Sequence, residues 1–153
     1  MRRMLWAFVV VLGAVSLSAQ TDPAVGTWKL NVAKSKYDPG PAPKSNTITI
    51  TAAGKGLKVS AKGTDAEGKP TTTDYTVSDD GKDAPVTGQA AYDSVSVKRI
   101  DKNTTEMTRK KAGKVVQTAR RAVSADGKTM TVTATGTNEK GQKINTVGVF
   151  DRQ

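Results

Sequence analysis

The sequence contains no cysteine and no histidine among its 153 residues. Without cysteine there can be no disulfide bond, no thiolate nucleophile and no zinc–sulfur site. Without histidine the commonest general base and metal ligand of proteins is missing. We therefore expect that the protein is not an enzyme, that it has no catalytic residues, and that it holds neither a metal ion nor a cofactor.

Aromatic residues make up only 5% of the chain. Proteins that bind single-stranded nucleic acid need exposed aromatic rings on which bases stack. Basic charge without such rings gives only nonspecific association that weakens with salt. We expect no specific nucleic-acid partner, because the aromatic residues beyond the N-terminal segment are few: Trp28, Tyr37, Tyr75, Tyr92 and Phe150.

No apolar run is long enough to cross a bilayer, which takes about 20 residues. Residues 4–15 are apolar, follow Arg2 and Arg3, and precede the small residues of Ser16-Leu17-Ser18-Ala19. This order is typical of a secretory signal peptide, here residues 1–19, cleaved after Ala19. We expect export to the periplasm or the medium, with no transmembrane span after cleavage. An uncleaved membrane anchor is the alternative.

The remaining chain, residues 20–153, has the length of a single domain. Losing Arg2 and Arg3 leaves 22 basic and 14 acidic residues, a formal charge of +8. Such a charge favours solubility and attraction to anionic surfaces. We expect a monomer whose stability comes from core burial and sheet hydrogen bonds.

A glycine turn recurs along the chain, at gaps of 14, 13, 32, 14 and 14 residues. Glycine adopts positive φ at little cost, so such turns are typical of β-hairpins. A gap near 14 leaves room for one strand and one turn, which predicts an antiparallel meander. The turns are Gly54-Lys55, Gly68-Lys69, Gly81-Lys82, Gly113-Lys114, Gly127-Lys128 and Gly141-Gln142.

Short runs between these turns alternate apolar and polar residues, as half-buried strands do. No window has a helical period, and we predict an all-β, antiparallel up-and-down β-barrel of 8–10 strands. Closure removes exposed strand edges; a Greek-key sandwich would need longer crossovers. The predicted strands are residues 25–33, 47–52, 57–63, 71–77, 94–100, 104–110, 115–123, 129–136 and 143–151, with a short one near 84–87.

The apolar face of these strands would line the interior and bind a ligand. Among the arginines, Arg99 and Arg109 continue inward faces, and we add Arg120, although Arg120 and Arg121 are adjacent and must point to opposite sides. An interior guanidinium would hold a ligand carboxylate; at the rim it would be solvated instead. The candidate ligand-binding residues are Ile48, Ile50, Val59, Tyr75, Val95, Val97, Arg99, Met107, Arg109, Arg120, Val132 and Phe150.

Two acidic features resemble a catalytic or metal-binding site only superficially. Asp74 and Glu106 lie mid-strand, but alternation places Asp74 outward, and we expect both to be solvated charges. Residues 79–83 read Asp-Asp-Gly-Lys-Asp and lack the alternating ligands and final glutamate of an EF-hand. We expect a plain turn there.

Residues 26–30 read Gly-Thr-Trp-Lys-Leu. A Gly-x-Trp on the first strand resembles the opening of the calycins, which are the lipocalins and fatty-acid-binding proteins, and of small exported bacterial proteins with the same first strand. Residues 126–133 and 149–152 resemble the last hairpin of a fatty-acid-binding protein. The resemblance implies a barrel in which Trp28 packs at the closed base.

The chain also departs from that family. Residues 34–46 are too short and too rich in proline for the helical lid, and Gly148-Val149-Phe150 replaces the Arg-x-Tyr that holds a carboxylate. Two hypotheses follow. The first is an exported binder of a small apolar or amphipathic ligand. The second is a protein-interaction or inhibitor-type envelope module with a filled core, acting through residues 34–46.

Overall fold

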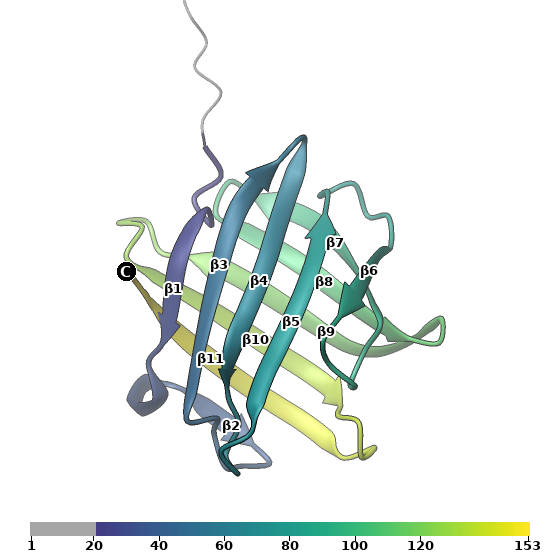
Figure 1. The fold of residues 1–153 in the computed structure, drawn as a ribbon. Helices are drawn as coiled ribbons and strands as arrows, with labels where there is room; N and C mark the ends of the chain where they lie inside the picture. Colours follow the sequence, from purple (N-terminus) through teal and green to yellow (C-terminus); the bar gives the residue numbers. More distant parts are fainter. Residues whose placement is uncertain (1–20) are drawn as a thin grey trace, which may run out of the picture.

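Strand follows strand through nearly all of the chain that the computed structural model describes, residues 21–153 (Figure 1). The predicted signal peptide lies outside the described residues. The strands are β1 (Gly26–Leu30), β2 (Lys36–Asp38), β3 (Ser45–Ala53), β4 (Gly56–Thr64), β5 (Pro70–Val77), β6 (Ala84–Thr87), β7 (Ser94–Asp101), β8 (Thr104–Lys111), β9 (Lys114–Val123), β10 (Thr129–Thr137) and β11 (Lys143–Arg152), and a single helical turn is η1 (Val32–Lys34).

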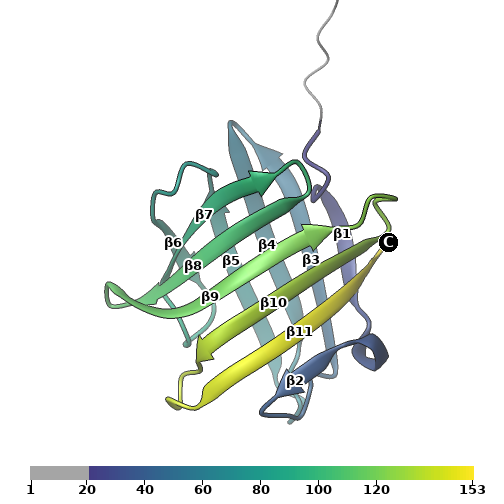
Figure 2. The same ribbon diagram turned by 180° about the vertical axis from the view of Figure 1, so that it is seen from behind.

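The sheet closes on itself because β1 pairs on one side with β3 and on the other with β11. Trp28 lies opposite Ile48 in the first pairing and opposite Arg152 in the second. From β3 to β11 each strand pairs with the next in antiparallel order, so β1 and β3 to β11 form a ring of ten strands (Figure 2). The short strand β2 is added to β11. The predicted antiparallel barrel is thereby confirmed.

The glycine turns lie where the spacing predicts them. All six have positive φ, from 56° at Gly54 to 91° at Gly68. In this region a side chain is strained and glycine is not. Five of the turns join consecutive, directly paired strands, and Gly81 lies in the longer connection between β5 and β6.

The first strand is shorter than the sequence pattern indicates. It ends at Leu30, and Val32 lies in η1 with 42% of its surface exposed, so the predicted strand over residues 25–33 is too long at its C-terminal end. The backbone turns because the Asn31 side chain accepts a hydrogen bond from the Lys34 amide at 3.1 Å. After this turn β2 pairs with β11 further along the same edge that β1 uses, and it places Tyr37 opposite Thr146.

Trp28 is the centre of the larger core cluster and is fully buried, which confirms its predicted core position. Its indole Nε1–H donates to the Ala24 carbonyl at 2.8 Å, so the ring's one polar atom is satisfied. The Arg152 guanidinium lies 4.1 Å from the centre of the ring. The same guanidinium donates to the carbonyls of Gly127 at 2.6 Å, Pro23 at 2.7 Å and Val25 at 2.8 Å. One side chain therefore ties the β9–β10 turn and the N-terminal segment to the end of β11.

We predict that Arg152→Met lowers the free energy of unfolding by about 2–4 kcal/mol, because three carbonyls lose a charged donor and Trp28 loses its cation. Urea denaturation followed by tryptophan fluorescence measures the change. The control is Arg120→Met, which removes an exposed arginine and should change stability by less than about 0.5 kcal/mol. Equal effects of the two substitutions would contradict this role of Arg152.

Candidate functional site: two cavities inside the barrel

The barrel is hollow in two places that share no lining residue. The upper cleft, of about 460 Å³, is lined by Thr21 and Asp22 of the N-terminal segment and by the turn between β3 and β4. This turn lies at the top end of the barrel in Figure 1. The lining of the cleft also includes Leu57, Val97 and Arg121. The lower cavity, of about 230 Å³, lies at the opposite end, beside β2, and its lining includes Tyr37.

A packed layer separates the two spaces. Along β8 the inward residues are Thr105, Met107 and Arg109, and they belong in turn to the upper cleft, the layer and the lower cavity. Met107 is 2% exposed, and the equally buried Ile50 and Val95 also line neither space. These three predicted ligand-binding residues are therefore core residues, since filled interiors leave no room between such side chains.

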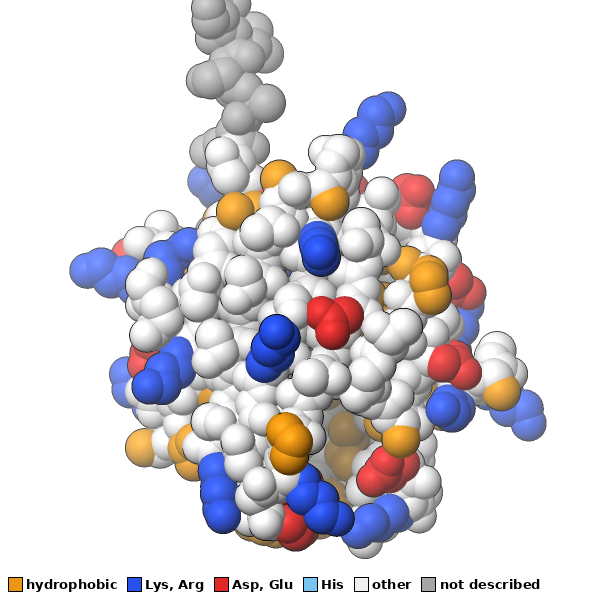
Figure 3. Space-filling view, in the orientation of Figure 1, with side chains coloured by type: hydrophobic (Ala, Val, Ile, Leu, Met, Phe, Trp, Pro, Cys, Tyr) orange, Lys and Arg blue, Asp and Glu red, His pale blue; other side chains and the backbone are white. Residues whose placement is uncertain are grey.

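Half of the predicted ligand-binding set meets in the lower cavity. Sequence reasoning missed the other side chains of its wall, above all Tyr37, which β2 brings in, and Tyr92, which lies outside any strand. On the face shown in Figure 3 the surface is hollowed at the lower right, with hydrophobic side chains inside the hollow. The predicted residues that line the lower cavity are Ile48, Val59, Tyr75, Arg109, Val132 and Phe150.

Arg109 is the one charged residue in the lining of the lower cavity. Its Nη1 donates to Gln117 Oε1 at 3.0 Å, and Gln117 Nε2 donates in turn to the Thr137 carbonyl at 2.9 Å. The guanidinium lies 4.8 Å from the centre of the Tyr92 ring, a favourable cation–π position. Arg109 is thus held in one orientation by neutral partners.

A glycine keeps the lower cavity open beside β2. A Cβ atom at Gly148 would lie 2.9 Å from Phe150 Cε2 and 3.4 Å from the Tyr37 hydroxyl. The first distance is shorter than real contacts allow, so any larger residue would push Phe150 or Tyr37 aside. Gly148 therefore leaves room for Tyr37 from β2.

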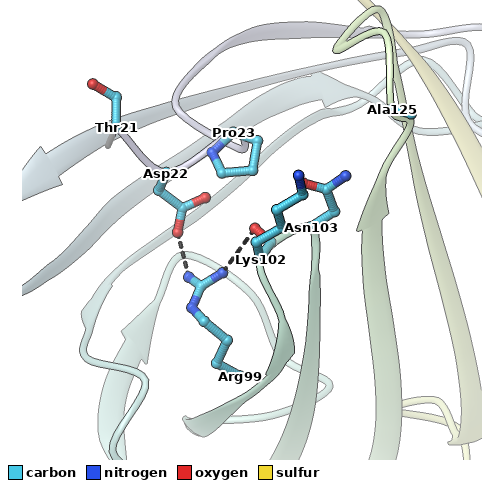
Figure 4. A pocket seen from close by; sticks show the side chains of 7 residues that line it. All are labelled: Thr21, Asp22, Pro23, Arg99, Lys102, Asn103 and Ala125. Atoms are coloured by element: carbon cyan, nitrogen blue, oxygen red, sulfur yellow. Dashed lines mark hydrogen bonds and ion pairs between the residues drawn. The ribbon is translucent and has the colours of Figure 1, made fainter. Parts of the chain in front are cut away.

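The upper cleft contains two predicted residues, Val97 and Arg99. Arg99 lies at the rim, where its guanidinium contacts the Asp22 carboxylate and donates to the Lys102 carbonyl at 3.3 Å (Figure 4). It also donates to Asp79 at 2.7 Å. Its side chain is 32% exposed. Two carboxylates balance its charge, so Arg99 is the solvated rim arginine of the alternative interpretation.

The interior arginine of the upper cleft is Arg121, and the choice of Arg120 is wrong. Arg120 is exposed on the outer face, whereas Arg121 is only 5% exposed. The reason is alternation along β9, where Gln117, Ala119 and Arg121 share the inward face. Applied from Ala119 onward, the same rule would have identified Arg121 from sequence.

Arg121 and Thr105 form an unpaired polar cluster. They are direct partners across β8 and β9, and Thr105 is 3% exposed. The Thr105 hydroxyl has no hydrogen-bond partner, and within residues 21–153 the Arg121 guanidinium has neither a hydrogen bond nor a carboxylate within 4.0 Å. Buried polar groups are normally paired, so this pair is poised for a ligand's oxygen atoms.

The acidic residues do not assemble into a reactive site. Asp74 on β5 is half-buried and Glu106 on β8 is exposed, and the two line no common cavity. Between β5 and β6, Asp79 pairs with Arg99 and Asp83 with Lys110 at 2.8 Å. Within residues 21–153 no three acidic side chains come close enough to hold a metal ion, and no helix is suited to span a membrane.

Burial raises the pKa of Tyr92 and of Tyr37 above the ordinary value of 10.0; at Tyr92 the charge of Arg109 acts in the opposite direction. The folded protein therefore holds these phenol protons more tightly than the unfolded chain does. The resulting stability is fully present below pH about 10 and is lost as the pH rises through the folded-state pKa.

We predict that part of the phenolate absorbance of the folded protein appears at a higher pH than that of an ordinary tyrosine. Tyr92→Phe should remove some of this part, and Tyr92→Phe combined with Tyr37→Phe should remove more. The unfolded protein in urea should lack this part, because burial causes it. If Tyr92→Phe removes only the phenolate absorbance that appears near pH 10, the burial of Tyr92 is contradicted.

No protein-family model matches the chain, and no curated protein matches its sequence. The structure is similar to the crystal structure of zebrafish ileal bile acid-binding protein complexed with cholic acid, with a TM-score of 0.51 and 11% sequence identity. The similarity covers 86% of this chain and 99% of that chain. At this identity the similarity shows the fold alone, which is a closed, antiparallel ten-strand β-barrel.

Proposed function

We propose that the protein is an exported binder of a small amphipathic ligand, and that the upper cleft holds it. The ligand's carboxylate would accept hydrogen bonds from Arg121 and Thr105, and its apolar body would lie along Leu57, Val77 and Val97, which line the same cleft. The observation that carries this proposal is Arg121, a residue only 5% exposed that lines the cleft and whose guanidinium has no carboxylate within 4.0 Å among residues 21–153.

An unpaired interior charge costs several kcal/mol of solvation, even after the protein relaxes. At an effective dielectric constant of about 20, an opposite charge about 4 Å away returns roughly 4 kcal/mol. A bound carboxylate therefore offsets a cost that the empty protein bears. Residues that bind at the expense of stability are typical of functional sites.

The apolar part of the ligand has room in the cleft. Its volume of about 460 Å³ lies within the range of about 300–1,000 Å³ usual for small-molecule pockets. Each buried methylene contributes about 0.8 kcal/mol, before the entropy of binding is subtracted. A chain of eight to ten carbons, about the size of a small pocket ligand, would bind measurably.

The fold gives further support by analogy. The zebrafish structure is a complex with cholic acid, an amphipathic carboxylate, in a barrel of the same kind. Fold likeness alone does not transfer a ligand, and here it agrees with the chemistry of the cleft. Export remains part of the proposal and depends on residues 1–19; N-terminal sequencing of the secreted protein, with Gln20 first, would support it.

One observation favours the alternative, a protein-interaction module with a filled core. The layer of Ile50, Val95 and Met107 fills the middle of the barrel. A dye-displacement screen of delipidated protein with decanoate separates the two functions. Displacement at one-to-one stoichiometry supports the binder, and no displacement supports the module.

We predict that Arg121→Met weakens decanoate binding by about 10- to 100-fold, the value of a hydrogen bond to a charged group. Binding of decanol, which has no charge, should change little. Arg120→Met is the matched control because it removes the neighbouring arginine from the outer face. If Arg121→Met and Arg120→Met weaken decanoate binding equally, the loss reflects the overall charge of the protein, and the proposed site is wrong.

We also predict that Arg121→Met and Thr105→Val leave the ligand-free protein as stable as the wild type, or up to about 2 kcal/mol more stable. Thr105→Val removes a buried hydroxyl that lacks a partner, and Arg121→Met replaces a guanidinium that lacks a carboxylate partner among residues 21–153 with an apolar group of similar size. Urea denaturation without ligand measures the change. A loss of stability would show that the two groups have structural partners.

A further inference from the structure

The lower cavity has the features of a binding site in its own right. It shares no lining residue with the upper cleft, and the packed layer around Met107 lies between them. Its wall is drawn from β2, from the segment before β7 and from both halves of the barrel. Any ligand that it takes must therefore enter at the end of the barrel beside β2.

The charge of the lower cavity selects an anion. Arg109 is the one charged residue in its lining, and within residues 21–153 no carboxylate lies within 4.0 Å of the guanidinium. A guanidinium has five N–H donors, and Gln117 accepts from one nitrogen, Nη1. Donors thus remain for a carboxylate, and the fixed position of Arg109 reduces the entropy lost on binding.

The other side chains in the wall of the lower cavity favour a ligand with an aromatic ring. Three tyrosines, Tyr37, Tyr75 and Tyr92, share the cavity with Phe150, so every tyrosine of the chain lies there. Aromatic side chains favour offset or edge-to-face contact with another ring. The Tyr75 hydroxyl has only a weak contact with Met107 Sδ, at 4.0 Å, so it is available to a polar substituent.

The size of the cavity limits the ligand to one ring. Its volume is about 230 Å³. An apolar cavity of about 150 Å³ already accepts benzene, whereas drug-sized ligands occupy about 300 Å³ or more. A ring with one acidic group fits between these limits, and a steroid or a long chain does not.

We propose that the lower cavity is a second binding site, for a single-ring aromatic carboxylate. The carboxylate would pair with Arg109, and the ring would pack among Tyr37, Tyr92 and Phe150. The site is independent of the upper cleft and would stand if the upper cleft bound nothing. Tyr37 distinguishes this site, because the short strand β2 supplies this residue to the cavity wall in place of a helical lid.

The test uses benzoate as the probe and the full mature chain. Isothermal titration measures affinity, and amide chemical shifts locate the bound molecule. We expect one-to-one binding, with the largest shifts at Arg109, Gln117 and Tyr92. Benzyl alcohol, the uncharged analogue, should bind at least 10-fold more weakly.

Three substitutions make the test specific. Arg109→Met should weaken benzoate about 10- to 100-fold. The matched control is Lys110→Met, which removes the same charge from the next residue, whose ammonium pairs with Asp83 outside the cavity lining. Ala61→Leu keeps Arg109 and fills the cavity that Ala61 lines, so it should abolish binding without changing the charge.

Two outcomes would overturn the proposal: unchanged benzoate affinity in both Arg109→Met and Ala61→Leu, or shifts that gather around Thr105 and Arg121. Arg121→Met distinguishes this site from the upper cleft. It should leave benzoate affinity unchanged while it weakens decanoate, so either site can fail without the other.

Discussion

The closure of the barrel between β1 and β11 is the contact on which the other features depend. Arg152 holds this seam from inside, stacked on Trp28 and bonded to three carbonyls from two other segments. Closure pairs β11 with β1, and β2 pairs further along the same edge, so most of this edge is not left open to a further chain. With the seam closed, every second residue of each strand faces a single enclosed interior. The chain closes the barrel with no disulfide and few aromatic residues, so closure depends on the correct register of β11 against its neighbouring strands.

That interior explains why both arginine sites exist. A ten-strand ring encloses more space than its small Val, Ala and Thr side chains can fill, so a space remains on each side of the packed middle layer. The spaces left at the two ends each receive one inward guanidinium, Arg121 above and Arg109 below. The two differ in their partners: Gln117 and Tyr92 hold Arg109, and Arg121 has none among the described residues. Arg109 therefore forms a preorganised site, whereas the unpaired charge of Arg121 carries a solvation cost that a bound ligand would reduce.

Local rules predicted most of the barrel, because glycine turns and alternation depend only on neighbouring residues. They placed Arg109 and Tyr75 inward and Trp28 in the core. They failed where a neighbour in space decides: Asn31 ends β1 before Val32 through a hydrogen bond within the turn, and β2 forms only because β11 has a free edge there. The pairing of Thr105 with Arg121 and the division of the interior into two spaces depend on cross-strand register. One sequence cannot fix that register for strands this similar.

The packed layer also determines how the two ends interact. Met107 lies between Thr105 and Arg109 on one strand, and Ala119 lies between Gln117 and Arg121 on the next. Because close-packed side chains cannot yield space without loss of contacts, a molecule cannot pass from one end to the other through this layer. Each site must fill from its own opening, and a ligand in the lower cavity meets Arg109 as its one charged residue, whereas the upper cleft has Arg121 inside and Arg99 at its rim. Since neither ligand touches the other's residues, their binding free energies should add, as they do for distant, independent sites. Coupling would require the layer itself to have two arrangements.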